Sequence, residues 1–280
     1  MQTTTGTVGG SKTFLALPIY GIDPFFSISM WNLVASNKFN GGIRPEVGDS
    51  SPSRIRNTLV HSFLESDCDQ LLFIDSDISF TPQDIERICY WKELVVGGFY
   101  CAKDARGAKL IYNNFGANQP PARPDGMQKV LFMGTGFLKI RRQVFEIMAN
   151  RLKDEICHQL DEAPAGTMRY AFFEEKVYKY PNGGTRFLTE DWLFCQRCQD
   201  LGIDVWADTG ILVNHHGGTA FPLEHHKAQI LRPATAQPAP VPAPSTPLPV
   251  VPGDGARTAS DTVTRDVTDQ FVRKPEPVTA

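Results

Sequence analysis

The chain has 280 residues, of which 41% are hydrophobic and 21% charged, and its formal net charge at pH 7 is −3. This length is enough for one large or two small domains with a sizeable buried core. A slightly acidic balance argues against general nucleic-acid binding by a basic surface. The first residues, MQTTTGTVGGSK, lack a signal-peptide pattern, and no run of eighteen apolar residues occurs, so we expect a cytoplasmic protein without a transmembrane segment.

Composition divides the chain into three parts. From residue 233 the sequence PATAQPAPVPAPSTPLPVVPGDG is rich in Pro and Ala and has no aromatic residue. Such a stretch favours extended polyproline conformations and buries little apolar surface. We therefore predict a flexible N-terminus over residues 1–11, a globular domain over 12–232, and a Pro/Ala-rich linker with a disordered tail over 233–280.

The globular part has the pattern of an α/β domain. Short apolar runs alternate with helical patterns across it, which is typical of a mainly parallel sheet flanked by helices. The first strand is predicted at residues 12–20 and is followed by a helix over 53–66. Ser51 suits the N-cap of this helix and Pro52 its first turn.

A buried strand and a second capped helix come next. Residues 70–75, QLLFID, form an apolar run that is typical of a buried strand. Thr81 suits an N-cap, Pro82 the first helical position, and Asp84 the acidic position of a capping box. The later predictions are strands at 93–101, 129–140, 204–208 and 210–216, and helices from about 142 and over about 191–201.

Two acidic residues follow the buried strand directly. Asp75 and Asp77 stand where ligands bind in open α/β sheets, beyond the carboxyl end of a strand. Alternation along the chain keeps both carboxylates on one side, and their repulsion is relieved by a nearby cation. Mg²⁺ or Mn²⁺ would take carboxylate oxygens there and leave other positions for phosphates and water. The alternative is that both acids are solvated or cap the turn that begins at Ser79.

Motifs further along the chain join this acidic pair in a recognisable order. Together with TEDWLFCQRCQDLGIDVWADTGILVNHHGG at residues 189–218, they resemble glycosyltransferases of the GT-A fold. The similarity is to bacterial and phage enzymes related to family 2 and to the yeast mannan-polymerase group, and it covers about residues 12–220. The matching elements are a DxD motif at Asp75 and Asp77, a glycine loop at Gly134, Thr135 and Gly136, an xED element at Glu190 and Asp191, a histidine at His215, and an Arg-Asn pair at Arg56 and Asn57.

The resemblance implies a metal-dependent enzyme. Such enzymes transfer a sugar, typically a hexose, from a nucleoside diphosphate sugar to an acceptor hydroxyl with Mn²⁺ or Mg²⁺. It implies that Asp77 is the main metal ligand and that Asp75 contacts the metal or the ribose. His215 would bind the same ion or a phosphate. Because neighbours on a strand point to opposite faces, only one of His215 and His216 should face the site, and the resemblance selects His215.

The resemblance also implies the catalytic and nucleotide-binding groups. Asp191 corresponds to the base that deprotonates the acceptor, and Glu190 to a residue that helps to place it. Gly134 and Gly136 would leave room for the sugar and acceptor near the backbone. The remaining donor contacts are expected from Pro18, Tyr20, Arg54, Arg56, Asn57, Asp75, Ser76 and Thr135. The donor sugar, the stereochemistry and the acceptor, which is a glycan, lipid, protein or modified DNA base, stay open.

Two other classes of function share parts of this pattern. FIDSDIS also resembles the motif of haloacid-dehalogenase phosphatases, in which Asp75 would be the nucleophile and Asp77 the acid/base. That family starts near its motif and carries a later GDxxxD-type cluster, which is not found here. The other class is a non-catalytic carbohydrate-binding or virion-associated module that docks through the Pro-rich tail.

Two further segments have open interpretations. Residues 166–187 combine aromatic and charged side chains and fit either a mobile acceptor loop or a β-hairpin with cross-strand aromatic pairs. Cys195 and Cys198 form a CxxC without a second pair, which favours reduced thiols that pack in or against a helix over a metal or redox site.

Overall fold

The computed structural model describes residues 11–37, 39–103, 110–113, 115, 118–159, 166–217 and 219–221. All of them belong to the first of two units into which the chain divides, residues 1–237. The predicted flexible N-terminus (except residue 11) and the predicted linker and tail lie outside the described residues.

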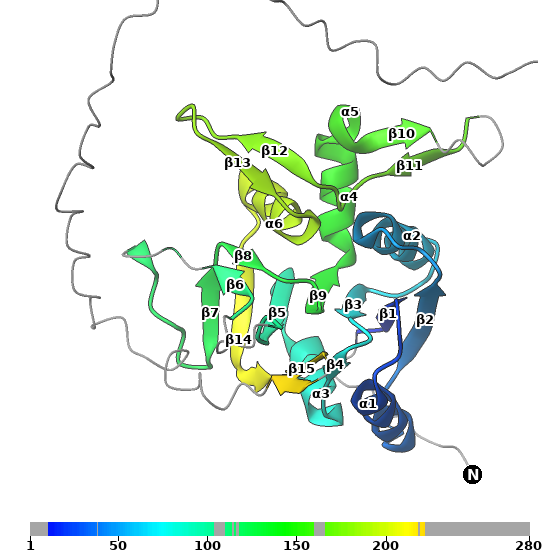
Figure 1. The fold of residues 1–280 in the computed structure, drawn as a ribbon. Coiled ribbons are helices and arrows are strands. Elements are labelled where there is room, and N and C mark those ends of the chain that lie inside the picture. The colour runs from blue at the N-terminus through cyan, green and yellow to red at the C-terminus, as the bar shows by residue number, and fades with distance from the viewer. Residues whose placement is uncertain are drawn as a thin grey trace, which may run out of the picture. The chain divides into compact units, whose positions relative to one another are not determined.

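A seven-stranded mixed sheet forms the centre of this unit (Figure 1). Strands β9 and β7 run antiparallel to the other five, which are parallel to one another. The predicted α/β class with a mainly parallel sheet is therefore confirmed. In spatial order the strands are β2 (Gly41–Val47), β1 (Thr13–Ile19), β3 (Gln70–Ile74), β9 (Phe137–Arg141), β5 (Val95–Phe99), β14 (Val205–Leu212) and β7 (Met127–Val130).

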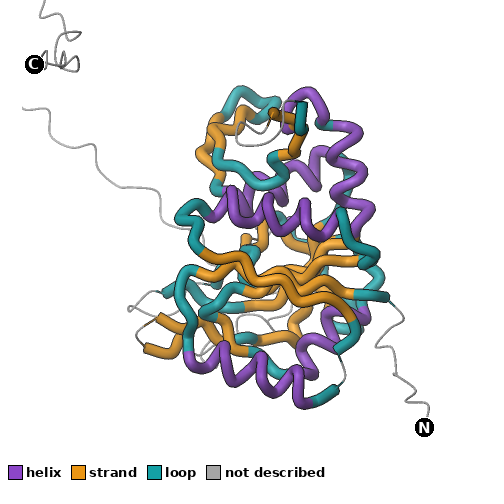
Figure 2. The backbone as a smooth tube through the Cα atoms, turned by 90° about the vertical axis from the view of Figure 1, so that its right-hand side faces the viewer, coloured by secondary structure: helices purple, strands orange, loops and turns teal. Residues whose placement is uncertain are grey.

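Helices cover both faces of the sheet (Figures 1 and 2). One face carries α2 (Pro52–Leu64), α4 (Arg142–Arg151) and α6 (Glu190–Asp200). The other carries α1 (Pro24–Ala35) and α3 (Pro82–Tyr90). The short α5 (Lys153–Ile156) follows α4. None of the helices in the described residues is long and apolar enough to cross a bilayer.

Smaller β-structures surround the central sheet. β15 (Asn214–Gly217) lies between β16 (Thr219–Phe221) and β4 (Ile78–Ser79), and β6 (Tyr112–Asn113) pairs with β8 (Phe132–Met133). Two antiparallel ribbons, β10 (Cys157–Gln159) with β11 (Met168–Tyr170) and β12 (Lys176–Lys179) with β13 (Thr185–Leu188), occupy the region above α4 and α6 in Figure 1. Much of segment 166–187 is thus β-structure, and Val177 pairs with Phe187 across the second ribbon.

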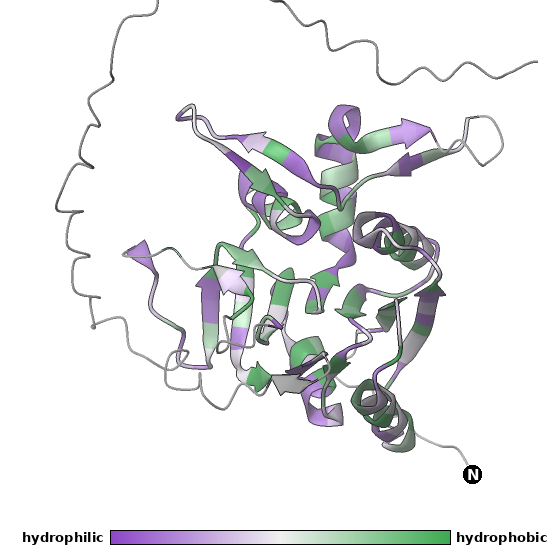
Figure 3. Ribbon diagram, viewed as in Figure 1, coloured by the Kyte–Doolittle hydropathy of each residue, from purple (hydrophilic) through white to green (hydrophobic). Residues whose placement is uncertain are grey.

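Apolar strands in the middle of the sheet create the core. Every residue of β1, β3 and β5 is buried, and Figure 3 shows these strands as mainly hydrophobic. The ring of Phe145 on α4 packs edge-on against Phe63 on α2 and against Phe172, with ring centroids 5.9 and 5.1 Å apart. Each such buried ring stabilises the fold by roughly 1.5–3 kcal/mol through transfer from water.

The predicted helix starts are confirmed. Ser51 Oγ accepts a hydrogen bond from the Arg54 amide at the start of α2. At α3, Thr81 Oγ1 accepts from the Asp84 amide, and Asp84 Oδ2 accepts from the Thr81 amide at 2.8 Å. This reciprocal capping box fixes the start of α3 at Pro82. Only a short segment therefore separates Asp77 from the helix.

Several element predictions were incomplete or wrong. Residues 129–140 are not one strand, because the chain turns at Gly134–Gly136 and divides between β7, β8 and β9. Residues 204–208 and 210–216 are not two strands either: β14 runs through both, and β15 begins only at Asn214. The sequence pattern also did not predict α1 and β2.

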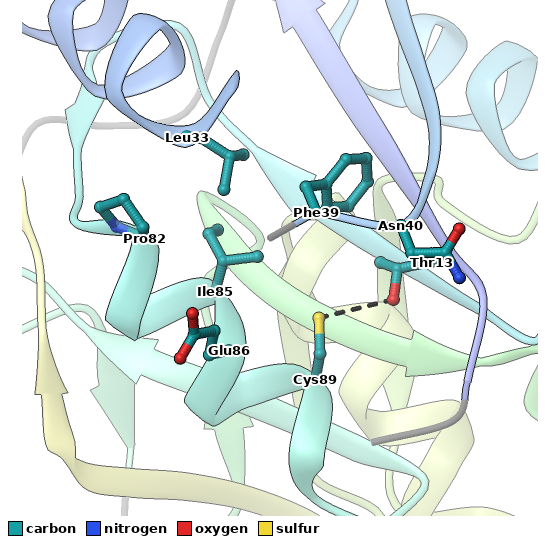
Figure 4. A pocket seen from close by; sticks show the side chains of 8 residues that line it. All are labelled: Thr13, Leu33, Phe39, Asn40, Pro82, Ile85, Glu86 and Cys89. Carbon is teal, nitrogen blue, oxygen red and sulfur yellow. Dashed lines mark hydrogen bonds between the residues drawn. The ribbon is translucent and has the colours of Figure 1, made fainter. Parts of the chain in front are cut away.

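A small hollow lies between α1, α3 and the first strand (Figure 4). Leu33, Phe39 and Ile85 line it together with Cys89, whose sulfur accepts a hydrogen bond from Thr13 Oγ1 at 3.5 Å. Its volume of about 20 Å³ has room for one water molecule. This hollow is too small for a nucleotide.

Candidate active site

A polar cleft opens at the carboxyl edge of the parallel strands. It has a volume of about 600 Å³ and is bordered by the ends of β1 and β3 and the first residues of α2 and α6. These segments meet there because the parallel strands of an open α/β sheet end at one edge, where the loops that follow them form a crevice. The predicted site residues that line the cleft are Pro18, Tyr20, Arg56, Asp75, Ser76, Asp77 and Glu190.

Asp77 and His215 meet in this region because two short strands pair. β15 is antiparallel to β4, with His215 opposite Ile78, and the His216 amide donates to the Asp77 carbonyl at 2.8 Å. His215 Nε2 then lies 3.4 Å from Asp77 Oδ2. His215 Nδ1 lies 2.7 Å from the Cys101 carbonyl oxygen, which requires a proton on that nitrogen. Nε2 is therefore the nitrogen that faces the carboxylate.

His216 points to the other side of β15. Its Nε2 lies 2.8 Å from Ser79 Oγ, and its ring stacks on Phe25 with centroids 4.7 Å apart. His216 thus contributes to packing between α1 and the small sheet. Of the two adjacent histidines, His215 is the one beside the acidic pair, as the resemblance implied.

Asp77 also lies beside a lysine ammonium. Lys103 Nζ lies 2.5 Å from Asp77 Oδ2. Burial opposes ionisation, but the contacts with His215 and Lys103 outweigh it and lower the pKa of Asp77 to about 2. Asp77 Oδ1 is buried and has no hydrogen-bond partner among the described residues. Lys103 was not predicted, because a single lysine in a loop has no sequence signature.

Asp75 belongs to a second charged group, centred on Arg56. Arg56 Nη2 lies 3.0 Å from Asp75 Oδ1, and Arg56 Nε lies 3.6 Å from Glu190 Oε1. The Arg56 side chain is only 7% exposed and lies over the Phe73 ring at 5.3 Å. Its Nη1 and Nε atoms are buried without hydrogen-bond partners in the described structure. Asp75 and Asp77 therefore face different cations, although one residue separates them.

The two acids at the start of α6 have different surroundings. Glu190 lines the cleft, whereas Asp191 Oδ1 accepts hydrogen bonds from Thr189 Oγ1 at 2.5 Å and from the Trp192 amide at 2.8 Å. Burial raises the pKa of both carboxyls, and for Glu190 the neighbouring charge of Asp191 adds to the effect. A raised pKa suits a carboxylate that accepts a proton during catalysis.

The glycine loop packs against Tyr100, a residue that sequence reasoning missed. Tyr100 follows β5, is 4% exposed, and its hydroxyl oxygen accepts a hydrogen bond from the Gly136 amide at 2.8 Å. A Cβ atom on Gly134 would lie 2.2 Å from this oxygen, and one on Gly136 would lie 2.8 Å away. The room that was predicted for substrate at these glycines is therefore taken by Tyr100. Thr135 between them is buried.

Two of the predicted donor contacts, Arg54 and Asn57, lie away from the cleft. Arg54 forms a two-point ion pair with Asp49, at 2.5 and 2.8 Å. The Asn57 amide donates to the Phe173 carbonyl at 2.8 Å and accepts from its amide at 3.0 Å, so it ties α2 to the chain after β11. Both side chains line a separate groove of about 400 Å³.

The CxxC pair is part of the core. Cys195 and Cys198 are buried in α6, and burial raises the pKa of Cys195 to about 12. Such thiols are poor nucleophiles. In the described part of the chain, no three His, Cys, Asp or Glu side chains converge as a ready metal site. Burial of both thiols in α6 is consistent with the packing interpretation of this motif.

Comparisons with known proteins give only distant likenesses. No protein-family model matches the sequence, and a search of curated protein sequences finds no match. Among solved structures, A197 from STIV has 18% identity and a TM-score of 0.44, with 75% of this chain and 93% of A197 covered. A glycosyltransferase involved in glycosylation of the major capsid of PBCV-1 has 12% identity and a TM-score of 0.31, with 78% and 98% covered.

A third neighbour is a synthase. It is a 4-diphosphocytidyl-2C-methyl-D-erythritol synthase from Anaerococcus prevotii, with 11% identity and a TM-score of 0.29, and the match covers 55% of this chain and 81% of that one. Scores at this level do not assign a function. The residues of the cleft themselves indicate which chemistry the site can perform.

Proposed function

We propose that this protein is a metal-dependent glycosyltransferase that uses a nucleoside diphosphate sugar and transfers the sugar, typically a hexose, to an acceptor hydroxyl. The observation that carries this proposal is the contact between Asp77 and His215, 3.4 Å apart beside a polar cleft at the carboxyl edge of the sheet. The cleft volume of about 600 Å³ lies in the usual range for small-molecule sites.

The residues at Asp77 fit a divalent cation such as Mn²⁺ or Mg²⁺. Asp77 Oδ1 is a buried oxygen without a hydrogen-bond partner in the described structure, and the His215 ring is oriented by the Cys101 carbonyl. A second group that orients a histidine in this way is typical of metal-binding imidazoles. Asp77 and His215 would hold the ion, with its remaining positions left to donor phosphates and water. A bound ion supplies charge neutralisation for the leaving diphosphate.

Arg56 provides the second cationic contact for the donor. Its guanidinium is buried at the cleft wall, and two of its nitrogens have no protein hydrogen-bond partner among the described residues. Asp75 and Glu190 hold it in place from two sides. We assign to Arg56 the binding of a donor phosphate or ribose oxygen, and to Asp75 its orientation. Pro18 and Tyr20, at the end of β1, would contact the nucleobase.

Asp191 is the proposed general base. Thr189 and the Trp192 amide hold one of its oxygens, which leaves the other to accept the proton of the acceptor hydroxyl. Glu190 lies in the cleft wall and would position the acceptor. Burial favours the protonated form of both carboxyls, so proton uptake by Asp191 is less costly than in water.

A thermal-shift screen with nucleotide sugars, each with and without Mn²⁺, tests the proposal. A shift that needs both donor and ion, and that disappears in Asp77→Ala, supports it. Donor hydrolysis assays on the same two proteins then measure turnover. Hydrolysis of a phosphomonoester in place of a nucleotide sugar would show a phosphatase, and absence of binding and turnover with every donor would reject an enzymatic role.

A further inference from the structure

Lys103 occupies the side of Asp77 that faces His215. Its Nζ atom lies 2.5 Å from Asp77 Oδ2, the same oxygen that lies 3.4 Å from His215 Nε2. A neutral imidazole with its proton on Nδ1 directs a lone pair from Nε2 toward this carboxylate, which is unfavourable without a positive charge nearby. The Lys103 ammonium supplies that charge in the metal-free protein.

The backbone of β15 is shaped for the Lys103 side chain. A Cβ atom on Gly217 would lie 2.6 Å from Lys103 Cδ and 3.0 Å from its Cε. The aliphatic part of Lys103 thus passes directly over a residue without a side chain, two positions after His215. The Lys103 side chain is also 39% exposed and lines the cleft with Arg56, so it has an open route away from Asp77.

An ammonium and a divalent ion cannot share this position. Both need the Asp77 carboxylate as their anionic partner, and two cations within a few ångströms of each other repel strongly at a partly buried site. Once it has left Asp77, the ammonium lies in a cleft that already contains the Arg56 guanidinium. Two cations there match the charge of a diphosphate, for which lysine is a common point-charge ligand.

We propose that Lys103 is the resident counter-ion of Asp77, that a divalent metal ion displaces it, and that the displaced ammonium then binds the phosphate oxygens of the donor. This inference rests on the proposed function and adds an order to it. Metal binding releases the group that binds the diphosphate, so the two ligands strengthen each other's binding. By linkage, diphosphate must raise metal affinity by the same factor.

Binding of Mn²⁺ alone, followed by the electron paramagnetic resonance signal of the free ion, tests the first half. In Lys103→Met we expect Mn²⁺ to bind about tenfold more tightly than in the wild type, because the competitor is gone. Lys103→Arg should keep wild-type affinity. Lys129→Met is the matched control, since Lys129 pairs with Asp204 on a different edge of the sheet and should leave Mn²⁺ affinity unchanged.

Inorganic pyrophosphate, titrated by calorimetry into the Mn²⁺-saturated proteins, tests the second half. Its affinity should fall about tenfold in Lys103→Met and stay near the wild-type value in Lys103→Arg. Unchanged pyrophosphate affinity in Lys103→Met would overturn the phosphate role. Thermal unfolding of each variant establishes that the proteins compared are folded.

The outcomes separate this inference from the function on which it rests. Equal Mn²⁺ affinity in the wild type and Lys103→Met, with loss of binding in Asp77→Asn, would overturn the counter-ion role while the metal site stands. Absence of Mn²⁺ binding in the wild type, Lys103→Met and Lys103→Arg alike would overturn the metal site and the inference with it.

Discussion

His215 Nε2 lies 3.4 Å from Asp77 Oδ2 because β15 pairs antiparallel with β4, and this pairing joins the end of the third strand of the chain to a segment that follows β14. The contact places an imidazole and a carboxylate on one side of the cleft. Neither residue has this partner unless these two short strands, far apart in the sequence, pair. The site is therefore a consequence of the topology as much as of the motifs.

The first prediction concerns this pair. Asp77→Asn and His215→Gln should each weaken Mn²⁺ binding at least tenfold and reduce sugar transfer at least a hundredfold, because each removes a ligand of the proposed ion. The free energy of unfolding should change by no more than about 1 kcal/mol for Asp77→Asn, since its ion pair with Lys103 is partly exposed.

His216→Gln provides the matched control for that experiment. His216 contacts Ser79 and Phe25 and points away from Asp77. Mn²⁺ affinity should therefore stay within a factor of two of the wild type. A loss of Mn²⁺ binding in His216→Gln that equals the loss in His215→Gln would contradict the assignment of His215.

The second prediction separates Asp75 from Asp77. Asp75→Asn should reduce transfer strongly but leave Mn²⁺ affinity nearly unchanged, because Asp75 pairs with Arg56 and not with the Asp77 group. Arg56→Lys should raise the KM for the donor about tenfold, since lysine cannot keep both Asp75 and Glu190 as partners and still donate to the ligand. If Asp75→Asn loses Mn²⁺ to the same extent as Asp77→Asn, the division into two charged groups is wrong.

The third prediction concerns the base. Burial raises the pKa of Asp191, and the base form is lost as the pH falls through that raised value. An exposed aspartate has a pKa of about 3.9. The acidic limb of the rate profile should therefore have its midpoint above that pH. Asp191→Asn should reduce transfer about a thousandfold, and its residual rate should lack this limb, as measured by kcat/KM for donor and acceptor between pH 4 and 9.

Glu190→Gln distinguishes the two acids of this element. It keeps the shape of the side chain, so transfer should fall mainly through the KM for the acceptor while the acidic limb remains. An acidic limb that disappears in Glu190→Gln and persists in Asp191→Asn would exchange the two assignments.

Local signals predicted much of the fold but not its pairing. The caps at Ser51 and Thr81 and the apolar runs of β1, β3 and β5 are signals contained in a few neighbouring residues, and all were predicted. Helix α1 was missed because its sequence PFFSISMWNLVA has no charged residue and no clear apolar stripe. Edge strand β2, GGIRPEV, contains Gly and Pro, which are rare inside central strands.

Site residues in local motifs were likewise predicted, whereas those defined by contacts between distant segments were missed. Three residues of the DxD and xED motifs, Asp75, Asp77 and Glu190, line the cleft, because each follows a strand or starts a helix. Lys103 and Tyr100 were missed, since their role depends on contacts across the sheet. Arg54 was expected to bind nucleotide but pairs with Asp49, because helical periodicity places it on another side of α2 from Arg56.

The fourth prediction tests the packing of Tyr100 on the glycine loop. Gly134→Ala should destabilise the fold by about 1–3 kcal/mol, because the added methyl group would lie 2.2 Å from the Tyr100 hydroxyl oxygen. Combining it with Tyr100→Phe should recover part of this loss, as measured by urea unfolding. Gly21→Ala is the control, since a Cβ there meets nothing within 4 Å.

The fifth prediction concerns Lys139, which is fully buried in β9. Its Nζ donates to the carbonyls of Trp91 and Glu93 at 2.8 and 2.6 Å, and burial lowers the pKa of Lys139 to about 7. Between this value and the ordinary lysine pKa of about 10.4, the unfolded chain binds a proton that the folded protein does not. Folding then releases that proton, so the contribution of Lys139 to stability rises with pH in this window, by up to about 1.4 kcal/mol per pH unit.

Urea unfolding of the wild type and Lys139→Met at pH 7, 8 and 9 measures this effect. The free energy of unfolding of the wild type should increase relative to that of Lys139→Met at each step, because methionine has no proton to release. Other groups titrate equally in both proteins, so they cancel in the difference. Lys129→Met should show no such trend, since Lys129 is partly exposed and paired with Asp204. A difference between wild type and Lys139→Met that stays constant from pH 7 to 9 would mean that Lys139 remains charged inside the sheet.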